Sequence, residues 1–448
     1  MSLALLLLAQ AGAPPARLSL EDAERIALHE SPDVRTAAAA AGGALADQKA
    51  QYGLLLPRLH VDGNVQYWGA PYSVSFLSSL SSLPANLPPQ IAQVLQALGS
   101  APPMVVRNTW TDAVNVTLSE PLTSLWGLYR TYEADQLARE AAIAHLGAAG
   151  RDLVFQVRLA YFHLLEATGN EAIAEDSVKQ LYSHVGVATQ QFEAGTIVKA
   201  DLLRAEVQLG QARQDLVKAK AAVLEAQAAL DALLGRPAGE TIEAVDPFTG
   251  GMPSPPREGL DELTDEAIRT RPDLRELALR RRQADKLAEA AVSQLIPTVA
   301  VEGQYQFQQG QLFMPENQAF AGATLSWDVW DWGNKYYAAK SARFRRDQAE
   351  ETLRAADLKL RSEVQTALQE LRADHDALAV AADVVDQAQE GFRLETQRYE
   401  AQAATATDLL DAQAALSQSK YRLSNARFDY LIALAQLEDL VGEPFLGR

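Results

Sequence analysis

The amino-acid sequence predicts a mostly α-helical protein with a membrane β-barrel portion, built as a duplicated strand hairpin plus long coiled-coil helices. Three observations support this fold class. Long stretches of the chain recur at a fixed offset, heptad seams run through segments rich in strong helix formers, and four short segments alternate polar and apolar residues. Together they predict one tandem structure rather than several unrelated domains.

The duplication is visible in two sets of matching runs. Residues 191–203 match residues 398–410 at an offset of 207. Nearer the N-terminus, residues 31–35 match 271–275 and residues 56–59 match 296–299, both at an offset of 240. These matches predict a first structural repeat over residues 14–240, a proline-rich linker over 241–260 and a second structural repeat over 261–448.

The N-terminal residues have the pattern of an export signal. An apolar run from Leu3 to Ala9 is too short to span a bilayer, and it precedes small residues that offer a cleavage site. We therefore expect residues 1–13 to be a signal peptide and the mature protein to be exported.

Composition excludes several classes of function. A formal charge of -18 at pH 7 disfavours a phosphate backbone as partner, so no nucleic acid is expected. The chain has no cysteine, which excludes disulfides, a thiol nucleophile and a thiolate metal site. The histidines show no His-Glu-x-x-His or Glu-x-x-His spacing, and no Gly-rich phosphate loop or nucleophile elbow occurs. We therefore expect no enzyme, no catalytic residue, no metal and no cofactor.

The four alternating segments are the candidate strands. No run of 18 or more apolar residues occurs, which excludes a membrane-spanning helix and leaves a β-barrel as the membrane option. Alternation predicts two strands in each repeat, at about 58–68 and 109–120 in the first and about 298–309 and 319–330 in the second. The other interpretation is that these are strands of a soluble sheet with one face on a core.

Aromatic residues favour the membrane interpretation, because they gather in the strands or at the strand ends, where membrane interfaces select them. The predicted membrane-interface aromatics are Tyr67, Trp68, Trp110, Trp126, Trp327, Trp330 and Trp332. Strands of about 10 residues, tilted by roughly 40°, would give a band about 25 Å tall. Four strands cannot close into a barrel, which needs at least about eight, so a membrane-embedded sheet requires oligomerisation.

Between the strands, heptad seams predict antiparallel coiled coils over about 128–235 and about 333–441. The seam of the last helix consists of Leu409, Ala412, Leu416, Ser419, Leu423, Ala426, Tyr430, Ala433, Leu437 and Leu440. Its copy consists of Leu202, Ala205, Leu209, Ala212, Leu216, Ala219, Val223, Ala226, Leu230 and Leu233. Large residues at one seam position and mostly small ones at the other predict close helix packing. Each helix pair reverses at a short turn, near Ala194 and near Gln402.

In its layout of duplicated hairpins and coiled coils, the chain resembles the TolC-like outer-membrane efflux channels. The run from Tyr399 to Asp411 is similar to the Tyr-x-x-Gly and Asp-x-Leu-Asp motifs of that family, and Trp-Gly recurs at 126–127 and 332–333 where strand passes into helix. The resemblance implies a homotrimer with a 12-stranded barrel in outer-membrane lipid, on an α-helical tunnel in the periplasm of a Gram-negative cell. It also implies a periplasmic adaptor and an inner-membrane pump as partners, and a role as exit duct in efflux or type I secretion.

The same resemblance implies a gate at the periplasmic turns. Asp408 and Asp411 match an acidic ring, and Tyr399 and Asp201 match closing contacts of the family. Ala404 stands where the family's best-known member has an arginine, and Gln402 replaces the turn glycine that the first repeat keeps. The other interpretation of the aspartates is that they cap a helix or interact with its dipole, which is common just after a turn.

A soluble periplasmic coiled-coil adaptor or scaffold is the alternative function. It would account for the heptad seams, but it leaves the alternating strands and the clustered tryptophans unexplained. An outer-membrane channel and a soluble adaptor differ in whether the strands form a membrane-embedded sheet.

Overall fold

The computed structural model describes residues 16–75, 88–99, 102–237, 242–248, 251–401 and 403–442. The predicted signal peptide over residues 1–13 lies outside these residues. The described part divides into two compact units, one formed from residues up to 44, 139–281 and 349 onward, the other from residues 45–138 and 282–348. Four helices, α2, α4, α7 and α8, have residues in both units.

The order of elements shows the duplication. The first repeat contains β1 (Ala16–Leu18), α1 (Leu20–Glu30), α2 (Pro32–Gly53), β2 (Arg58–Tyr67), β3 (Tyr72–Val74), α3 (Pro89–Gly99), β4 (Met104–Pro121), α4 (Ser124–Glu193) and α5 (Lys199–Leu233). The second follows β5 (Ile242–Ala244) and contains α6 (Leu260–Thr270), α7 (Pro272–Val292), the 3-10 turn η2 (Ser293–Leu295), β6 (Thr298–Gln311), β7 (Asn317–Ser326), α8 (Asn334–Glu400) and α9 (Ala406–Val441). The long helices have 70 and 67 residues, and the helices that follow them have 35 and 36, so matched sequence has produced matched elements.

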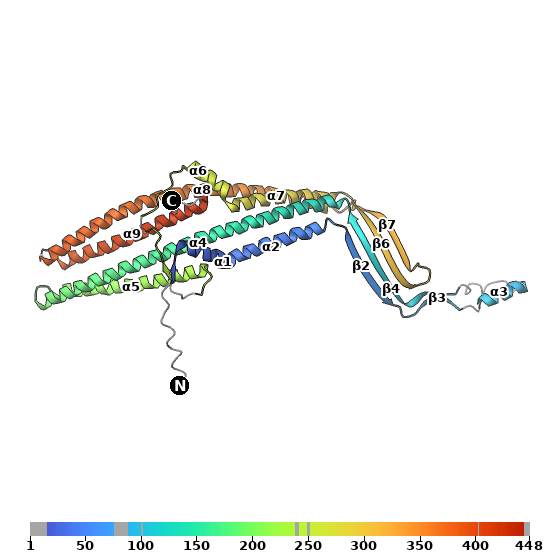
Figure 1. Ribbon diagram of the computed structural model, residues 1–448, viewed down its shortest axis with the longest axis horizontal. Coiled ribbons are helices and arrows are strands. Elements are labelled where there is room, and N and C mark those ends of the chain that lie inside the picture. The colour runs from blue at the N-terminus through green and yellow to red at the C-terminus, as the bar shows by residue number, and fades with distance from the viewer. Residues whose placement is uncertain are drawn as a thin grey trace, which may run out of the picture. The chain divides into compact units, whose positions relative to one another are not determined.

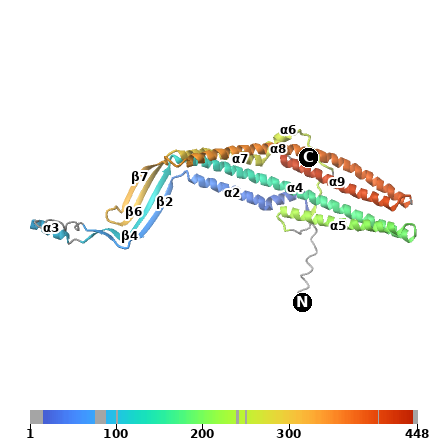
Figure 2. The ribbon, with the colours of Figure 1, turned by 180° about the vertical axis from the view of Figure 1, so that it is seen from behind.

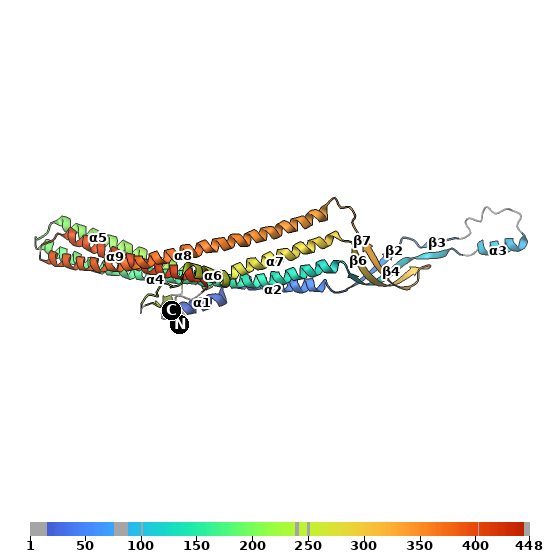
Figure 3. The same ribbon diagram turned by 90° about the horizontal axis from the view of Figure 1, so that it is seen from above.

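In the unit with the strands, an antiparallel sheet has the order β2-β4-β6-β7, and the short β3 also pairs with β4. The register aligns Arg58 with Ser119 and Thr298 with Ser326. The strand ends that adjoin helices therefore all lie at the same end of the sheet, as Figures 1 and 3 show. The strands β2 and β7 form the two outer edges of the sheet.

The fourth strand differs from its prediction. Alternation predicts a strand over about 319–330, but β7 covers Asn317–Ser326, so Trp327 and Trp330 lie beyond it. Its partner β6 begins at Thr298, directly after Pro297, which has no N–H to donate to a ladder. Pairing cannot continue past Ser326 without a partner. The strand β4, in contrast, extends to 18 residues because it pairs on both sides.

In the other unit, α4 packs against α5, α9 packs against α4, and α8 packs against α9. Figures 1 and 2 show the two helix pairs side by side, with α5 and α8 as the outer members. Most seam positions predicted for the C-terminal half of α9 are buried, among them Tyr430, Ala433, Leu437 and Leu440. In α5 the buried seam positions include Ala205, Leu209, Ala212 and Leu230. The heptad seams therefore face the partner helices.

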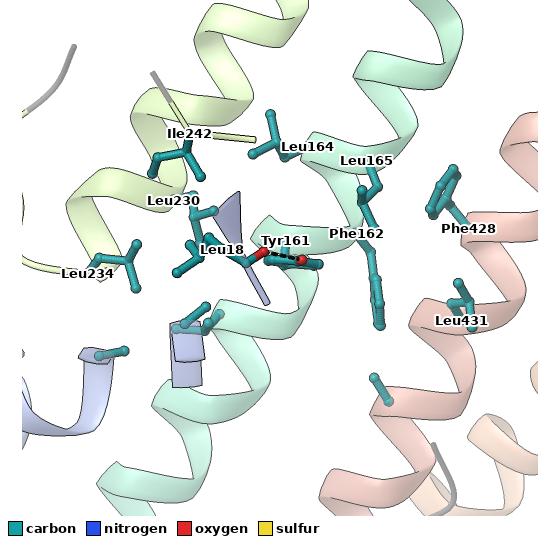
Figure 4. Packing of buried hydrophobic residues seen from close by; sticks show 14 of the residues in the cluster. Leu18, Tyr161, Phe162, Leu164, Leu165, Leu230, Leu234, Ile242, Phe428 and Leu431 are labelled. Atoms are coloured by element: carbon teal, nitrogen blue, oxygen red, sulfur yellow. Dashed lines mark hydrogen bonds between the residues drawn. The ribbon is translucent and has the colours of Figure 1, made fainter. Parts of the chain in front are cut away.

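The predicted linker over 241–260 contains a strand that alternation did not reveal. Strand β5 pairs in parallel with β1, aligning Leu18 with Ala244. The fully buried Tyr161 of α4 places its hydroxyl 2.7 Å from the carbonyl oxygens of both Leu18 and Val245. Figure 4 shows Tyr161 between Leu18 and Phe162, with Phe428 and Leu431 of α9 on the far side of Phe162. This cluster joins the N-terminal strand, the segment between the repeats, and helices α4 and α9.

Within the described residues, no helix has both the length and the apolar character needed to cross a membrane.

Candidate functional site

The candidate site lies at the two helix turns that join α4 to α5 and α8 to α9. In the first turn, Gly195 has a φ of 74°, a left-handed conformation that favours glycine. The Thr196 N–H donates to the Gln191 carbonyl at 2.9 Å, and its hydroxyl donates to the same oxygen at 2.9 Å. The first turn is therefore closed by main-chain and side-chain hydrogen bonds onto the last turn of α4.

The second turn is closed differently, by a capping box at the start of α9. The Thr405 N–H donates to the Asp408 carboxylate at 2.9 Å, and the Asp408 N–H donates to the Thr405 hydroxyl at 3.2 Å. Hydrogen bonds from the main chain and side chain of Thr405, with the charge of Arg398, lower the pKa of Asp408. The helix-capping interpretation therefore holds for Asp408 in the single chain. The predicted glycine replacement at Gln402 lies outside the described residues.

Tyr399 joins the two helix pairs. Its hydroxyl donates to the Gln191 side-chain oxygen of α4 at 2.6 Å. Burial, with a further contribution from the Asp201 carboxylate, raises the pKa of Tyr399, so the phenol stays neutral and able to donate. Asp201 lies in the first turn of α5.

One heptad earlier in both helices, α4 and α8 meet again. The rings of His184 and Phe392 lie with their centroids 6.0 Å apart in an edge-to-face arrangement. Burial lowers the pKa of His184, which favours the neutral imidazole near pH 7. A single stripe on α4, containing His184 and Gln191, therefore contacts a single stripe on α8, containing Phe392 and Tyr399.

Arg204 is a site residue that sequence reasoning did not assign. Its guanidinium donates to the Thr407 hydroxyl of α9 at 3.1 Å and lies 3.7 Å from the Asp201 carboxylate. Arg204 and the exposed Asp411 also line one cavity of about 410 Å³ between α5 and α9. A signal was present, because Arg204 occupies the position in the first repeat that Asp411 occupies in the second.

The four predicted gate residues thus occupy one end of the helix pairs, in different environments. Tyr399 makes a contact between the pairs, and Asp201 contacts Arg204. Asp408 caps α9, and Asp411 lines the neighbouring cavity. Among the described residues, no group of His, Asp or Glu side chains has the arrangement of a metal site.

The predicted interface aromatics lie in and beside the sheet, and most are exposed. The rings of Tyr67 and Trp110 lie 4.9 Å apart on paired strands. The Trp68 ring carries the Arg107 guanidinium at 3.6 Å and donates through Nε1 to Thr111 at 3.0 Å. The other residues of the set with exposed side chains are Trp126, Trp327, Trp330 and Trp332. Large aromatic rings exposed on a sheet are unfavourable in water, so this surface is suited to an apolar environment.

Comparisons with known proteins agree with this architecture. The profile of the family described as "Outer membrane efflux protein" matches residues 25–236 and 263–443. Outer membrane protein TolC of Vibrio cholerae is 23% identical over 316 residues, which is 69% of this chain and 72% of that protein. Among solved structures, the CmeC outer membrane channel of Campylobacter jejuni has a TM-score of 0.78 at 16% identity, covering 94% of this chain and 85% of that one. The open state of the MtrE outer membrane channel of Neisseria gonorrhoeae has a TM-score of 0.76 at 20% identity, covering 94% and 88%.

Duplicated hairpins joined to paired long helices define the class of outer-membrane channel subunits. The family profile covers most of the chain, in one block per repeat. The chain belongs to the outer membrane efflux protein family, and its function is that of an outer-membrane exit duct for efflux. This result decides against the soluble adaptor or scaffold alternative.

Proposed function

We propose that three copies of this chain form a closed channel whose gate lies at the turns between α4 and α5 and between α8 and α9. A periplasmic adaptor and an inner-membrane pump would deliver substrate to this gate and supply the energy, since the chain has no phosphate-binding loop of its own. The observation that carries the proposal is a pair of exposed apolar stripes on the two outer helices of the single chain.

On α5 the exposed stripe has heptad spacing and lies on a different face from the buried seam. Its members are Leu203, Val207, Gly210, Val217, Ala221 and Leu224, and its large side chains are roughly half to two-thirds exposed. On α8 a similar stripe consists of the exposed residues Ala373, Ala377, Val380, Val384 and Leu394 and the half-buried Gly391. A heptad stripe of small and apolar residues on a helix that already has one buried seam indicates a second helix partner.

Charge beside the stripes favours contact between the α5 stripe of one copy and the α8 stripe of the next. Arg213 and Lys220 lie beside the stripe on α5, where Lys220 also lies 3.4 Å from the Glu175 carboxylate of α4, and Asp376 and Asp383 lie beside the stripe on α8. Because the two stripes differ, such a contact is heterologous: each copy binds the next through a different surface. A closed assembly built from this contact is therefore a ring. Three copies are proposed because the resemblance to the TolC-like channels implies a trimer, and four long strands per copy would then give 12, above the minimum of about eight that a closed barrel needs.

The open edges of the sheet support the same assembly. All ten residues of β2 and nine of the ten residues of β7 are exposed in the single chain. Long, flat, exposed edge strands are prone to pair with other chains, and a closed ring of strands removes both edges. In the proposed channel, β7 of one copy pairs with β2 of the next.

The gate is proposed to open when the α8–α9 pair moves away from the α4–α5 pair. Near the turns, contacts between the pairs include two single hydrogen bonds, Tyr399 to Gln191 and Arg204 to Thr407. Farther from the turns the pairs share a buried core around Phe162 and Phe428. Together with the His184–Phe392 ring contact and the small apolar cluster that Leu410 joins, these contacts near the turns bury far less than the core around Phe162 and Phe428, so the turn end is the part of this unit that can separate.

Cysteine cross-linking tests the assembly cleanly, because the natural chain has no cysteine. The α5 stripe and the α8 stripe run in opposite directions from the turns, so Val217 is level with Val380 and Leu203 with Leu394. Disulfides should form between copies in Val217→Cys, Val380→Cys double variants, giving covalent trimers on denaturing gels. The matched control combines Val217→Cys with Leu394→Cys, which are about 21 Å apart along the helix axis and should not cross-link. Equal cross-linking of both pairs would refute the proposed packing.

A further inference from the structure

The start of helix α8 has a charge opposite to that of the whole chain. Residues 334–346 contain five Lys or Arg and no Asp or Glu, whereas the chain has a formal charge of -18 at pH 7. Counted from the recurring Trp-Gly pairs, the matching residues 128–140 of α4 contain two basic and three acidic residues. In α4, Arg130 lies 2.6 Å from Glu133 and 2.9 Å from Glu289 of α7, so its charge is balanced within the chain. The uniformly basic segment therefore belongs to α8 and not to its copy.

Nearby carboxylates balance only part of this charge. Lys335 lies 2.8 Å from the Asp328 carboxylate. Asp331 accepts hydrogen bonds from two main-chain N–H groups and so caps the first turn of α8. The exposed Lys340 and Arg343, in contrast, form no ion pair with a carboxylate of the described residues. Two cations on this helix are therefore available to an external anion.

Lys340 and Arg343 share their face of α8 with exposed aromatic side chains. Tyr336, Lys340 and Arg343 follow one another at spacings of four and three residues, which places them on one face, and Tyr337 and Phe344 flank them. Each of the three aromatic side chains is more than half exposed. The Lys340 Nζ atom lies 5.8 Å from the centroid of the Phe344 ring, within reach of a cation–π interaction. Cations interleaved with aromatic rings are typical of a membrane interface.

The place of this face along the chain sets what it meets. Helix α8 begins shortly after β7 ends at Ser326, and a helix rises about 1.5 Å per residue, so Lys340 and Arg343 lie about 9 and 14 Å from the helix start. The headgroup layer on each side of a bilayer is roughly 5–8 Å thick. In an outer-membrane protein with membrane-embedded strands, these long side chains therefore reach the headgroups of the periplasmic leaflet.

The next copy in the proposed channel would not neutralise these cations. Because β7 of one copy would pair with β2 of the next, α8 would adjoin α2, which leads into β2. Near the sheet, residues 45–53 of α2 contain one carboxylate, Asp47, and one cation, Lys49. Burial, with a contribution from the Asp47 charge, raises the pKa of Asp135, so Asp47 lies beside α4 of its own chain.

We propose that the α8 face formed by Tyr336, Tyr337, Lys340, Arg343 and Phe344 binds the headgroup of an anionic phospholipid in the periplasmic leaflet. Lys340 and Arg343 would contact the phosphodiester group, and the aromatic rings would pack against the glycerol and the upper part of the acyl chains. A zwitterionic headgroup carries its own ammonium group and gains less from these cations. The inference rests on the outer-membrane location of the strands and not on the proposed gate.

Native mass spectrometry of the full-length protein in detergent tests this site. The protein is mixed with equal amounts of phosphatidylglycerol and phosphatidylcholine that have the same acyl chains, and the ratio of the two bound lipids is measured. The wild type should retain more phosphatidylglycerol. Each Lys or Arg near an anionic membrane surface strengthens the attraction roughly fivefold, so Lys340→Gln, Arg343→Gln should lower the ratio by up to about 25-fold, toward one.

The matched control is Lys359→Gln, Arg372→Gln, which removes one exposed lysine and one exposed arginine from α8 more than about 35 Å from the helix start. It should keep the wild-type ratio. The charge-conserving variant Lys340→Arg, Arg343→Lys should also keep it, which separates loss of charge from damage to the helix.

Four outcomes would overturn the proposal. They are equal retention of the two lipids by the wild type, a wild-type ratio in the glutamine variant, an equal fall in the control, and a glutamine-like ratio in the charge-conserving variant. Inorganic phosphate should displace no more lipid than chloride at equal ionic strength. Displacement by phosphate alone would assign Lys340 and Arg343 to a free anion and contradict a lipid site.

Discussion

Replacing Tyr399 by phenylalanine removes one hydroxyl and leaves the aromatic ring in place. That hydroxyl donates the 2.6 Å hydrogen bond to Gln191 that joins α8 to α4 next to the turns. If opening separates these helices, the closed state loses the bond in the variant and the open state loses nothing. The variant should therefore open more often than the wild type, with the conductance of the open pore unchanged.

The expected increase in the ratio of open to closed channels follows from the number of copies in the channel. A hydrogen bond contributes a net amount of about 1 kcal/mol, and Gln191 is half-buried, so water can satisfy it only partly once the phenol is gone. Three copies opening together would lose about 3 kcal/mol. Because about 1.4 kcal/mol corresponds to a factor of ten, the ratio of open to closed channels should rise on the order of 100-fold.

Single-channel recording in a planar bilayer measures this ratio directly. Tyr182→Phe is the matched control, since Tyr182 lies on α4 and is 66% exposed. The control should open as rarely as the wild type. An unchanged open probability in Tyr399→Phe, in a protein that elutes and melts like the wild type, would refute the assignment of this contact to the gate. So would an equal increase in the control.

Three further predictions concern other parts of the chain. Replacing Asp408 and Asp411 together by alanine should abolish block of the channel by multivalent cations, and block at wild-type strength would place the acidic ring elsewhere. Tyr161→Phe should lower the free energy of unfolding by about 1 kcal/mol, measured by denaturant titration, because the single proton of the buried phenol, which faces the carbonyl oxygens of Leu18 and Val245, no longer donates a hydrogen bond. Burial lowers the pKa of His184 below its usual value, so the stabilisation it gives is present above about pH 6.5 and is lost as pH falls. Channel opening should therefore increase as the pH falls below about 6.5, and His184→Gln should remove that pH dependence; an identical profile in the variant would contradict it.

Sequence periodicity predicted the helices and strands in which apolar residues recur at a regular spacing. The long helices and the four long strands each contain enough residues for a period of 3.6 or 2 to be read, and the structure has helices and strands in those places. The parallel pair β1 and β5 could not be predicted in this way. Each strand has three residues, too few to show alternation, and the pairing joins segments more than 220 residues apart.

The candidate site was predictable only in part, for a related reason. The resemblance pointed to Tyr399 and to the aspartates of the turns, but a motif does not show which atoms a side chain meets. Asp408 is held by Thr405 in a capping box, which the spacing of the two residues permits but does not require. Arg204 reaches Thr407 on a helix from the other repeat, and no local pattern predicts such a contact.

The burial of a polar side chain could not be predicted from the heptad pattern, because that pattern identifies buried positions by their apolar residues. Gln413 follows the seam residue Ala412 by one position and is not itself a seam position. The structure buries it because α4 and α5 both approach α9 at this level, which widens the buried face beyond one seam.

The most direct test of the account is the mass of the detergent-solubilised protein, measured by light scattering with the detergent contribution subtracted. The proposed channel requires three chains, each of 48.6 kDa before removal of the predicted signal peptide, held together by the sheet edges and the helix stripes. A mass close to three chains would support the shared barrel and the threefold gate. A monomer that stays in solution without detergent would contradict both.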